Sequence, residues 1–242
     1  MTPVGKHALI TGAASGIGRA TALRLAAAGV GRLTLLDRDR AGIDEVARLV
    51  AAAGPQVASL SCDVSDVAAL TAAFDEAAAS APIDMVFNNA GVVTGAPLFP
   101  AATTQRIAQV FAINVTGVVL GTQLAIQHMS GRGGVVINTV STSHDNAGFR
   151  DVLYTTSKAA VYQFTRACAQ FLEPTGVRVC GISPGLVDTP ILDTTGGDRR
   201  AEWMTPILAN NVALAPGAIA DAVLEAWQDD SFIGEVRAVR AE

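Results

Sequence analysis

Residues 7–18 run HALITGAASGIG, an apolar stretch that leads directly into a turn with three glycines. The first part, His7–Thr11, lacks the regular polar alternation of a half-exposed strand, as is typical of a strand covered on both faces. The turn contains Gly12, Gly16 and Gly18, and glycine permits tight turns and close contact between a strand and the helix after it. We therefore predict a strand that turns at once into a helix near Ile17, the first half of a β-α-β unit.

The same alternation of a short apolar run and a longer helical stretch continues along the chain. We expect strands at His7–Thr11, Arg32–Asp37, Gln56–Ser61, Asp84–Asn88, Gly134–Val140, Val177–Ile182 and Gly234–Val239. We expect helices at Ile17–Ala28, Ala41–Ala53, Asp66–Ala79, Thr103–Met129, Val152–Leu172 and Ala218–Gln228. Helices of roughly 12 residues suit crossovers between parallel strands. The pattern predicts an α/β fold, a single domain over residues 1–242 with a doubly wound parallel sheet of about seven strands and helices on both faces.

The stretch Thr189–Pro216 breaks this rhythm. It contains Gly196, Gly197, three prolines and a short predicted helix at Arg199–Ala209. An irregular insertion after the carboxyl end of a strand lies where open α/β sheets bind ligands. We interpret it as a substrate lid, with a plain connecting loop as the alternative.

Composition excludes several classes of protein. Half of the residues are hydrophobic and 16% are charged, which excludes a disordered or fibrous chain. The net charge is −5 and the basic residues are scattered, so we expect neither nucleic acid nor membrane as a partner. The cysteines Cys62, Cys168 and Cys180 are odd in number and widely spaced, as expected of small core residues and not of a disulfide frame or a metal site. We expect a cytoplasmic protein without a signal peptide or membrane span.

The glycine turn and the next strand together suggest a nucleotide site. A helix N-terminus after a glycine turn offers unpaired N–H groups and a positive dipole end to phosphates. Asp37 ends the second predicted strand, 19 residues after Gly18. A carboxylate about 20 residues beyond such a turn is where the ribose hydroxyls of a dinucleotide are held. The combination predicts dinucleotide binding.

A tyrosine and a lysine lie four residues apart in a predicted helix, which places Tyr154 and Lys158 on one helical face. A free tyrosine has a pKa near ~10, too high for a base at neutral pH. A neighbouring ammonium and an oxidised nicotinamide would both favour the phenolate. Lys158 is one of only two lysines, the other being Lys6. The alternative is an amphipathic helix without a catalytic role.

Ser141 favours the catalytic interpretation. It follows the predicted strand Gly134–Val140 and lies 13 residues before Tyr154. Its hydroxyl can donate to a carbonyl oxygen that gains negative charge as hydride arrives. A loop serine that caps a turn is the alternative.

The glycine spacing over residues 12–18, the run Asn88-Asn89-Ala90-Gly91, the motif around Asn114 and the Tyr-x3-Lys pair follow one another in an order that resembles the short-chain dehydrogenase/reductase family. The resemblance covers nearly the whole chain. It implies catalytic roles for Ser141, Tyr154, Lys158 and Asn114. It implies cofactor contacts from Gly12, Ser15, Gly16, Ile17, Gly18, Asp37, Asp63, Val64, Asn88, Ala90, Gly91, Tyr154, Lys158, Pro184, Gly185, Val187 and Thr189. By the same resemblance, Asn114 would disturb its helix so that a backbone carbonyl holds a water that links Lys158 to solvent.

The choice between NAD and NADP depends on charge. The Asp37 carboxylate accepts hydrogen bonds from ribose hydroxyls and would repel a 2′-phosphate. Relatives that use NADP often have a basic residue where this chain has Ser15. Arg38 and Arg40 are evidence for NADP, because their positive charges could favour a 2′-phosphate. We expect NAD.

Mainly apolar residues are expected to surround the substrate. They are Ser143, His144, Phe149, Leu186, Ile191, Leu192, Trp203 and Met204. With few charges directed inward, a neutral, fairly hydrophobic secondary alcohol or ketone fits best.

The predicted helices Thr103–Met129 and Val152–Leu172 have apolar residues around much of their circumference, so each needs burial on a second side. Since the family commonly pairs these helices, we expect a homodimer or homotetramer.

Three other interpretations stay open. One is a ketone reductase of a biosynthetic pathway that uses NADPH. Another is a non-catalytic nucleotide-binding module, which would leave Ser141, Tyr154 and Lys158 without a reason to occur together. A methyltransferase is also doubly wound, but the Tyr–Lys pair would then be unexplained.

Overall fold

The computed structural model describes residues 2–241 and has one seven-stranded sheet at its centre. Its strands are β1 (His7–Thr11), β2 (Arg32–Asp37), β3 (Gln56–Ser61), β4 (Met85–Asn88), β5 (Gly134–Thr139), β6 (Val177–Pro184) and β7 (Val236–Val239). They lie in the order β3-β2-β1-β4-β5-β6-β7, and every neighbouring pair is parallel. The predicted doubly wound α/β fold is confirmed.

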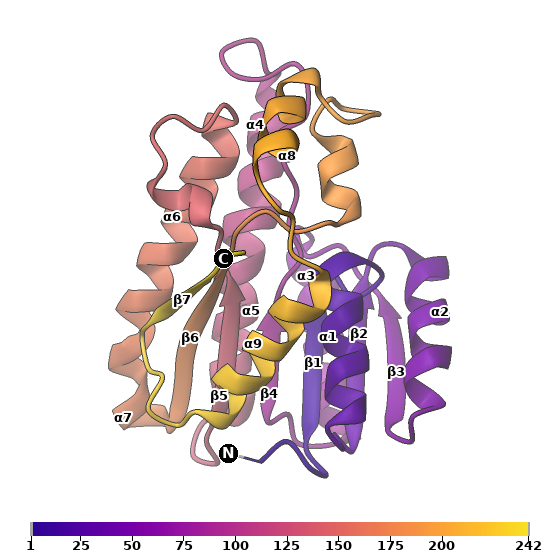
Figure 1. The fold of residues 1–242 in the computed structure, drawn as a ribbon. Helices are drawn as coiled ribbons and strands as arrows, with labels where there is room; N and C mark the ends of the chain where they lie inside the picture. The colour runs from indigo at the N-terminus through magenta and orange to yellow at the C-terminus, as the bar shows by residue number, and fades with distance from the viewer. Residues whose placement is uncertain (1, 242) are drawn as a thin grey trace.

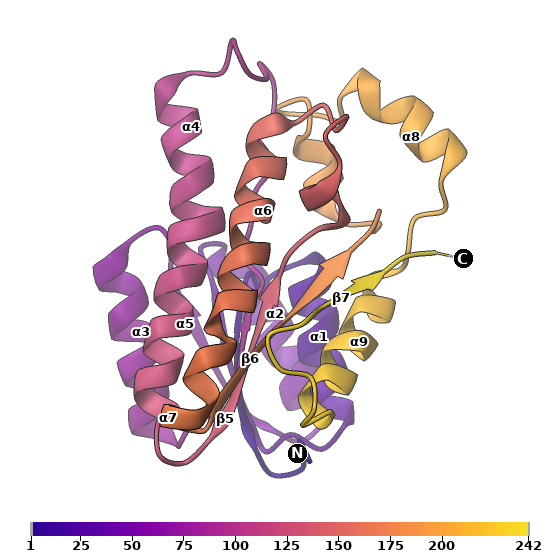
Figure 2. The same ribbon diagram turned by 90° about the vertical axis from the view of Figure 1, so that its left-hand side faces the viewer.

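Helices cover both faces of the sheet, as Figures 1 and 2 show. On one face lie α1 (Gly16–Ala27), α2 (Arg40–Ala51) and α9 (Pro216–Gln228). On the other lie α3 (Val67–Ser80), α4 (Thr104–Phe111), α5 (Gly117–Met129) and α6 (Val152–Ala167). Successive residues of β1 alternate between the two cores, with Ala8 and Ile10 in one and Leu9 in the other. This period of two makes each strand apolar throughout, because both of its faces are buried.

Most expected boundaries agree with the structure to within two residues, and three differences are informative. The helix expected over Thr103–Met129 contains a π-helical turn, Ala112–Thr116, between α4 and α5. The helix expected over Val152–Leu172 ends at Ala167 and is followed by a 3₁₀ turn and the short α7 (Leu172–Thr175). β6 continues to Pro184 and brings the next segment to the edge of the sheet.

The insertion Thr189–Pro216 lies above the carboxyl ends of the strands (Figure 1). It contains the 3₁₀ turns η4 (Pro190–Thr194) and η5 (Glu202–Met204) and the helix α8 (Thr205–Asn210). The helix expected at Arg199–Ala209 is wrong in its first turn. Residues 199–201 instead have no helical structure, and the Arg199 carbonyl accepts the Gly196 N–H at 2.8 Å.

The helical run Thr104–Met129 has 26 residues and contains an 18-residue apolar window with a mean hydropathy of 1.5, enough by length and composition to cross a membrane. Core helices commonly share these properties. Here 44% of the apolar window is buried inside the fold, where α5 packs against α3 and β4. Val119 on α5 and Phe171 after α6 are exposed apolar side chains. The expected homodimer or homotetramer stays a prediction.

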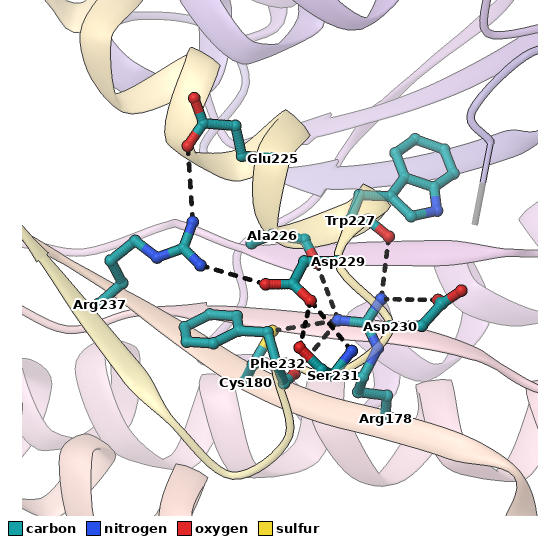
Figure 3. Close-up of polar contacts among 10 residues, drawn as sticks. All are labelled: Arg178, Cys180, Glu225, Ala226, Trp227, Asp229, Asp230, Ser231, Phe232 and Arg237. Carbon is teal, nitrogen blue, oxygen red and sulfur yellow. Dashed lines mark hydrogen bonds and ion pairs between the residues drawn. The ribbon is translucent and has the colours of Figure 1, made fainter.

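A buried arginine closes the end of the fold opposite the insertion (Figure 3). Arg178 on β6 donates to the carbonyls of Ala226 at 2.8 Å, Trp227 at 2.9 Å and Phe232 at 3.3 Å. The carbonyls of Ala226 and Trp227 belong to the last turn of α9 and have no partner within that helix. The side chain is 5% exposed and also lies 3.6 Å from the Asp230 carboxylate. Arg178 thereby fixes the C-terminus of α9 and the loop that leads to β7.

We expect Arg178→Met to lower the free energy of unfolding by about 3 kcal/mol, since it leaves buried carbonyls without their donor. Chemical denaturation monitored by circular dichroism would measure the loss. Arg237→Met is the matched control, because Arg237 pairs with Glu225 and Asp229 while 36% exposed. Its loss should stay below about 1 kcal/mol. Equal losses for the two variants would contradict this account.

Candidate active site

A cavity of about 620 Å³ opens at the carboxyl ends of the strands. It lies where β1 and β4 are neighbours in the sheet and the chain leaves them toward helices on opposite faces. Ligands of open α/β sheets bind at this reversal of strand order. The insertion supplies part of the wall through Leu192, Trp203 and Met204.

The glycine turn lines one end of the cavity. Gly12 has φ 66° and Gly16 has φ 51°, in the left-handed region that favours glycine. Ser15 and Ile17 line the cavity beside them, at the N-terminus of α1. Gly18 lies outside the lining, and its role is packing, because a Cβ there would approach the Gly12 carbonyl oxygen to 2.0 Å.

Two carboxylates lie farther along this end of the cavity, at the ends of β2 and β3. Asp37 accepts the Ala14 N–H at 3.0 Å, so its position is tied to the glycine turn. Asp63 accepts both the hydroxyl and the N–H of Ser65, and these hydrogen bonds lower the pKa of its carboxyl. Arg38 also lines this part of the cavity. The carboxylates suit neutral hydroxyl groups and disfavour a phosphate.

The asparagines that end β4 have different places. Asn88 is 2% exposed, and its amide donates to Thr122 at 3.2 Å and to Asn138 at 2.9 Å, beneath the cavity and outside its lining. Asn89 lines the cavity instead, and its Nδ2 lies 3.1 Å from the carbonyl oxygens of Thr11 and Gly12. Asn88, expected to contact the cofactor, thus lies outside the cavity lining, while its neighbour Asn89 holds the glycine turn. Ala90 and Gly91 line the cavity as expected.

Ser141, Tyr154 and Lys158 converge on the other end of the cavity and all line it. The Lys158 Nζ donates to the Thr139 carbonyl at 2.9 Å and lies 5.8 Å from the centroid of the Tyr154 ring. A hydrogen bond joins the side chains of Ser141 and Tyr154. Pro184, Gly185, Val187 and Thr189 form the wall between this group and the glycine turn.

Burial governs the ionisation of this group. It raises the pKa of Tyr154 above its ordinary value, and the Asp151 carboxylate raises it further, against the hydrogen bond from Ser141 that lowers it. Burial also lowers the pKa of Lys158 to about 8. The expected lowering of the Tyr154 pKa is thus not produced by the side chains of the chain alone, and requires a further positive charge beside the phenol.

Asn114 lies within the π-helical turn, which confirms the predicted disturbance of its helix. It is fully buried and outside the cavity lining. Its Oδ1 accepts the Val92 N–H at 2.8 Å, and its Nδ2 donates to the Val92 carbonyl at 2.8 Å and to the Ser157 hydroxyl at 3.0 Å. Asn114 therefore acts through the residues that it holds.

The predicted substrate wall is largely present. Ser143, Phe149, Leu186, Ile191, Leu192, Trp203 and Met204 all line the cavity. His144 does not, because its ring stacks on Tyr162 with centroids 4.2 Å apart. The sequence reasoning missed Asp151, a carboxylate that lines the cavity and is 2% exposed. An aspartate directly before a predicted helix is a helix-capping signal that could have identified it.

Comparison with known proteins identifies relatives over most of the chain. A family model described as short chain dehydrogenase matches residues 6–200. Momilactone A synthase of Oryza sativa subsp. japonica is 39% identical, over 94% of this chain and 85% of that protein. The cis-4-hydroxycyclohexanecarboxylate dehydrogenase of Sinomonas cyclohexanicum is 34% identical, over 89% of this chain and 86% of that protein. The 15-hydroxyprostaglandin dehydrogenase [NAD(+)] of Mus musculus is 32% identical, over 98% and 90%.

Solved structures have the same fold. A short-chain type dehydrogenase/reductase from Mycobacterium marinum superposes with a TM-score of 0.88 at 28% identity, over 98% of this chain and 95% of that one. Levodione reductase gives a TM-score of 0.88 at 28% identity, over 98% and 96%. The 3-ketoacyl-(acyl-carrier-protein) reductase from Brucella melitensis, complexed with NADH, gives 0.87 at 28% identity, over 98% and 97%.

The lowered pKa of Lys158 predicts how stability depends on pH. The folded chain releases this proton near pH 8, whereas the unfolded chain holds it up to its ordinary value of 10.5. Because the unfolded state binds more protons in that window, wild type should gain about 3 kcal/mol relative to Lys158→Met as the pH rises from about 7 to about 10. Parallel urea titrations of both proteins would measure the gain. Wild type and Lys158→Met both contain Tyr154, so its titration does not account for a difference between them. If the difference in the free energy of unfolding did not change with pH, the burial of the charge would be contradicted.

Proposed function

Because this chain belongs to the short-chain dehydrogenase/reductase family, we propose that it transfers a hydride between NAD and a secondary alcohol or ketone. The observation that carries the proposal is the convergence of Ser141, Tyr154 and Lys158 on the cavity that also contains the glycine turn and Asp37. A hydride transfer needs a dinucleotide and a proton donor within one site. One end of the cavity has the glycine turn and Asp37, which suit a dinucleotide, and the other end has Tyr154 as a proton donor.

The residues of the first end fit NAD. The start of α1 offers N–H groups to a pyrophosphate, and no Cβ intrudes at Gly12 or Gly16. Asp37 would accept hydrogen bonds from the adenosine ribose. When bound, the nicotinamide supplies the hydride or accepts it, and in its oxidised form it carries positive charge. The name of the Mus musculus relative includes NAD(+), and the Brucella melitensis structure is complexed with NADH.

In the proposed chemistry the protein moves one proton and stabilises one oxygen. Tyr154 exchanges a proton with the substrate hydroxyl, and Ser141 donates a hydrogen bond to the same oxygen as negative charge develops there. Lys158, held by the Thr139 carbonyl, adds positive charge beside the ring. Since burial raises the pKa of Tyr154, this charge and that of the oxidised nicotinamide would both be needed before the phenol serves as a base.

The wall of the cavity favours a substrate that is neutral and apolar at its reacting end. Phe149 lies against Tyr154, with ring centroids 6.3 Å apart, and against Trp203 at 5.8 Å. Ile191 and Leu192 complete an apolar surface on the insertion. A secondary alcohol or ketone carried on an aliphatic or cyclic skeleton would bury its carbon atoms here. We propose that the insertion closes over it as a lid.

Tyr154→Phe removes only the hydroxyl that exchanges the proton. We expect kcat to fall by about 10³-fold, since proton transfer by a positioned group contributes on this scale. The dissociation constant for NADH, from the quenching of protein fluorescence, should stay within about twofold of wild type. Substantial remaining turnover would show that Tyr154 is not the proton donor. Undetectable NADH binding by wild type would contradict the proposal as a whole.

Asp37 should decide the cofactor. We expect kcat/KM to be at least about tenfold higher with NADH than with NADPH, because the carboxylate repels a 2′-phosphate. Asp37→Ser should reduce this preference, as Arg38 then faces the phosphate without a competing charge. Steady-state rates with both cofactors and one ketone test this. A wild-type preference for NADPH would favour the alternative, a ketone reductase that uses NADPH, for which Arg38 in the cavity wall is the supporting observation.

A further inference from the structure

Hydrogen bonds through intervening side chains connect the segment Val92–Thr94, which follows β4, to both the N–H and the carbonyl of Tyr154. Asp151 links it to the N–H of Tyr154, and Asn114 links it to the Tyr154 carbonyl through Ser157. These contacts form a closed ring of hydrogen bonds around the first turn of α6. The position of the phenol therefore depends on a segment distant in the sequence.

Asp151 makes the shorter link. It is the N-cap of α6, and its Oδ1 accepts the Tyr154 N–H at 3.1 Å. Its Oδ2 accepts the Thr94 N–H at 2.8 Å, and its Oδ1 also accepts the Thr94 hydroxyl. Both carboxylate oxygens are thus satisfied inside the protein, where the side chain is 2% exposed. The three hydrogen bonds satisfy a carboxylate that would otherwise be costly to bury.

Arg106 on α4 holds the segment from its other side. Its Nε donates to the Thr94 carbonyl and its Nη2 to the Val93 carbonyl, both at 2.6 Å. Its Nη1 donates to Gln109 at 2.7 Å. Burial lowers the pKa of Arg106, and the Asp151 carboxylate opposes this lowering, so the two charges act on each other across the segment between them.

The longer link is neutral. The Ser157 hydroxyl donates to the Tyr154 carbonyl at 2.6 Å and accepts from Asn114 at 3.0 Å. Asn114 in turn makes two hydrogen bonds to the backbone of Val92. This side of the ring orients α6 without adding charge near the phenol. The Asp151 side of the ring both orients α6 and adds a negative charge.

We propose that Asp151 is a positioning residue for Tyr154, whose carboxylate fixes the first turn of α6 to Thr94. The proposal rests on the proposed function, in which Tyr154 exchanges the proton. The same carboxylate is an anion that contacts the backbone of residue 154, which gives the proposal an electrostatic half: loss of this charge should make the phenol easier to ionise.

The charged groups around the phenol come from three elements. Burial is the largest cause that raises the pKa of Tyr154, and Asp151 at the start of α6 raises it further. Lys158 on the same helix lies 5.8 Å from the centroid of the Tyr154 ring. Arg106 on α4 lies beyond Asp151 and partly offsets its charge. From η2 (Thr142–Asp145), His144 stacks on Tyr162. Of these groups, Asp151 is the anion that contacts the backbone of residue 154.

Within residues 2–241, the other helix caps lack this arrangement. Asp66 caps α3 by accepting the N–H groups of Ala68 and Ala69, both within its own helix, and it is exposed. Asp151 instead contacts Thr94, 57 positions away in the sequence, and is buried. Asp66→Asn is therefore a matched control that removes the same charge from the same kind of cap, away from the cavity.

The chain contains two tyrosines, Tyr154 and Tyr162, which allows a direct titration. Tyrosine labelled with ¹³C at Cζ gives two NMR signals, and Tyr162→Phe assigns them. In the protein without cofactor, we expect Asp151→Asn to lower the midpoint of the Tyr154 titration by about one pH unit, as loss of a neighbouring charge commonly does. Asp66→Asn should leave it unchanged. An unchanged or raised midpoint in Asp151→Asn would overturn the electrostatic half of the proposal.

Thr94 tests the positioning half and serves also if Asp151→Asn fails to fold. Thr94→Val removes the hydroxyl bond to Asp151 and keeps the charge. We expect kcat to fall roughly tenfold with the dissociation constant for NADH unchanged, and Thr94→Ser to restore it. Wild-type kcat in Thr94→Val would overturn the positioning role. The titration needs no substrate, so a failure of the proposed function, seen as absence of turnover by wild type, is distinguished from a failure of this inference.

Discussion

The burial of the Lys158 ammonium against the Thr139 carbonyl is the interaction on which the site depends. A buried cation is costly, and the fold tolerates it only where backbone oxygens are fixed in place. The end of β5 supplies such an oxygen, and α6 holds the lysine over it. Burial of the phenol likewise raises the pKa of Tyr154, so in the proposed mechanism the pair needs positive charge beside the phenol.

The sheet brings the two ends of the cavity together. β1 leads into the glycine turn on one face, and β4 leads into the segment that frames α6 on the other. Asn89 fastens the turn to the end of β4 through the Thr11 and Gly12 carbonyls. Beneath it, Asn88 donates to Asn138 on β5 and thereby ties the neighbouring strands. Hydrogen bonds thus connect the two ends of the cavity through neighbouring strands of the sheet.

The sequence allowed the fold and most of the site to be predicted, because strands buried on both faces are uniformly apolar and the glycine turn is local. It did not distinguish Asn88 from Asn89, since which of two consecutive residues faces the cavity depends on the exact end of β4. The place of His144 depends on stacking against Tyr162, a tertiary contact. Asp151 was missed because its partner Thr94 lies 57 residues away.

The transfer of deuterium from NADH labelled at C4 of the nicotinamide tests the central claim most directly. A panel of apolar ketones would be reduced with the label on either face of the ring, and the alcohols analysed by mass spectrometry. We predict that one of the two labels appears on the carbon that bears the new hydroxyl, in every alcohol formed. Alcohols without the label, or tight binding of NADH with no reduction of any ketone, would contradict the account and favour a nucleotide-binding module.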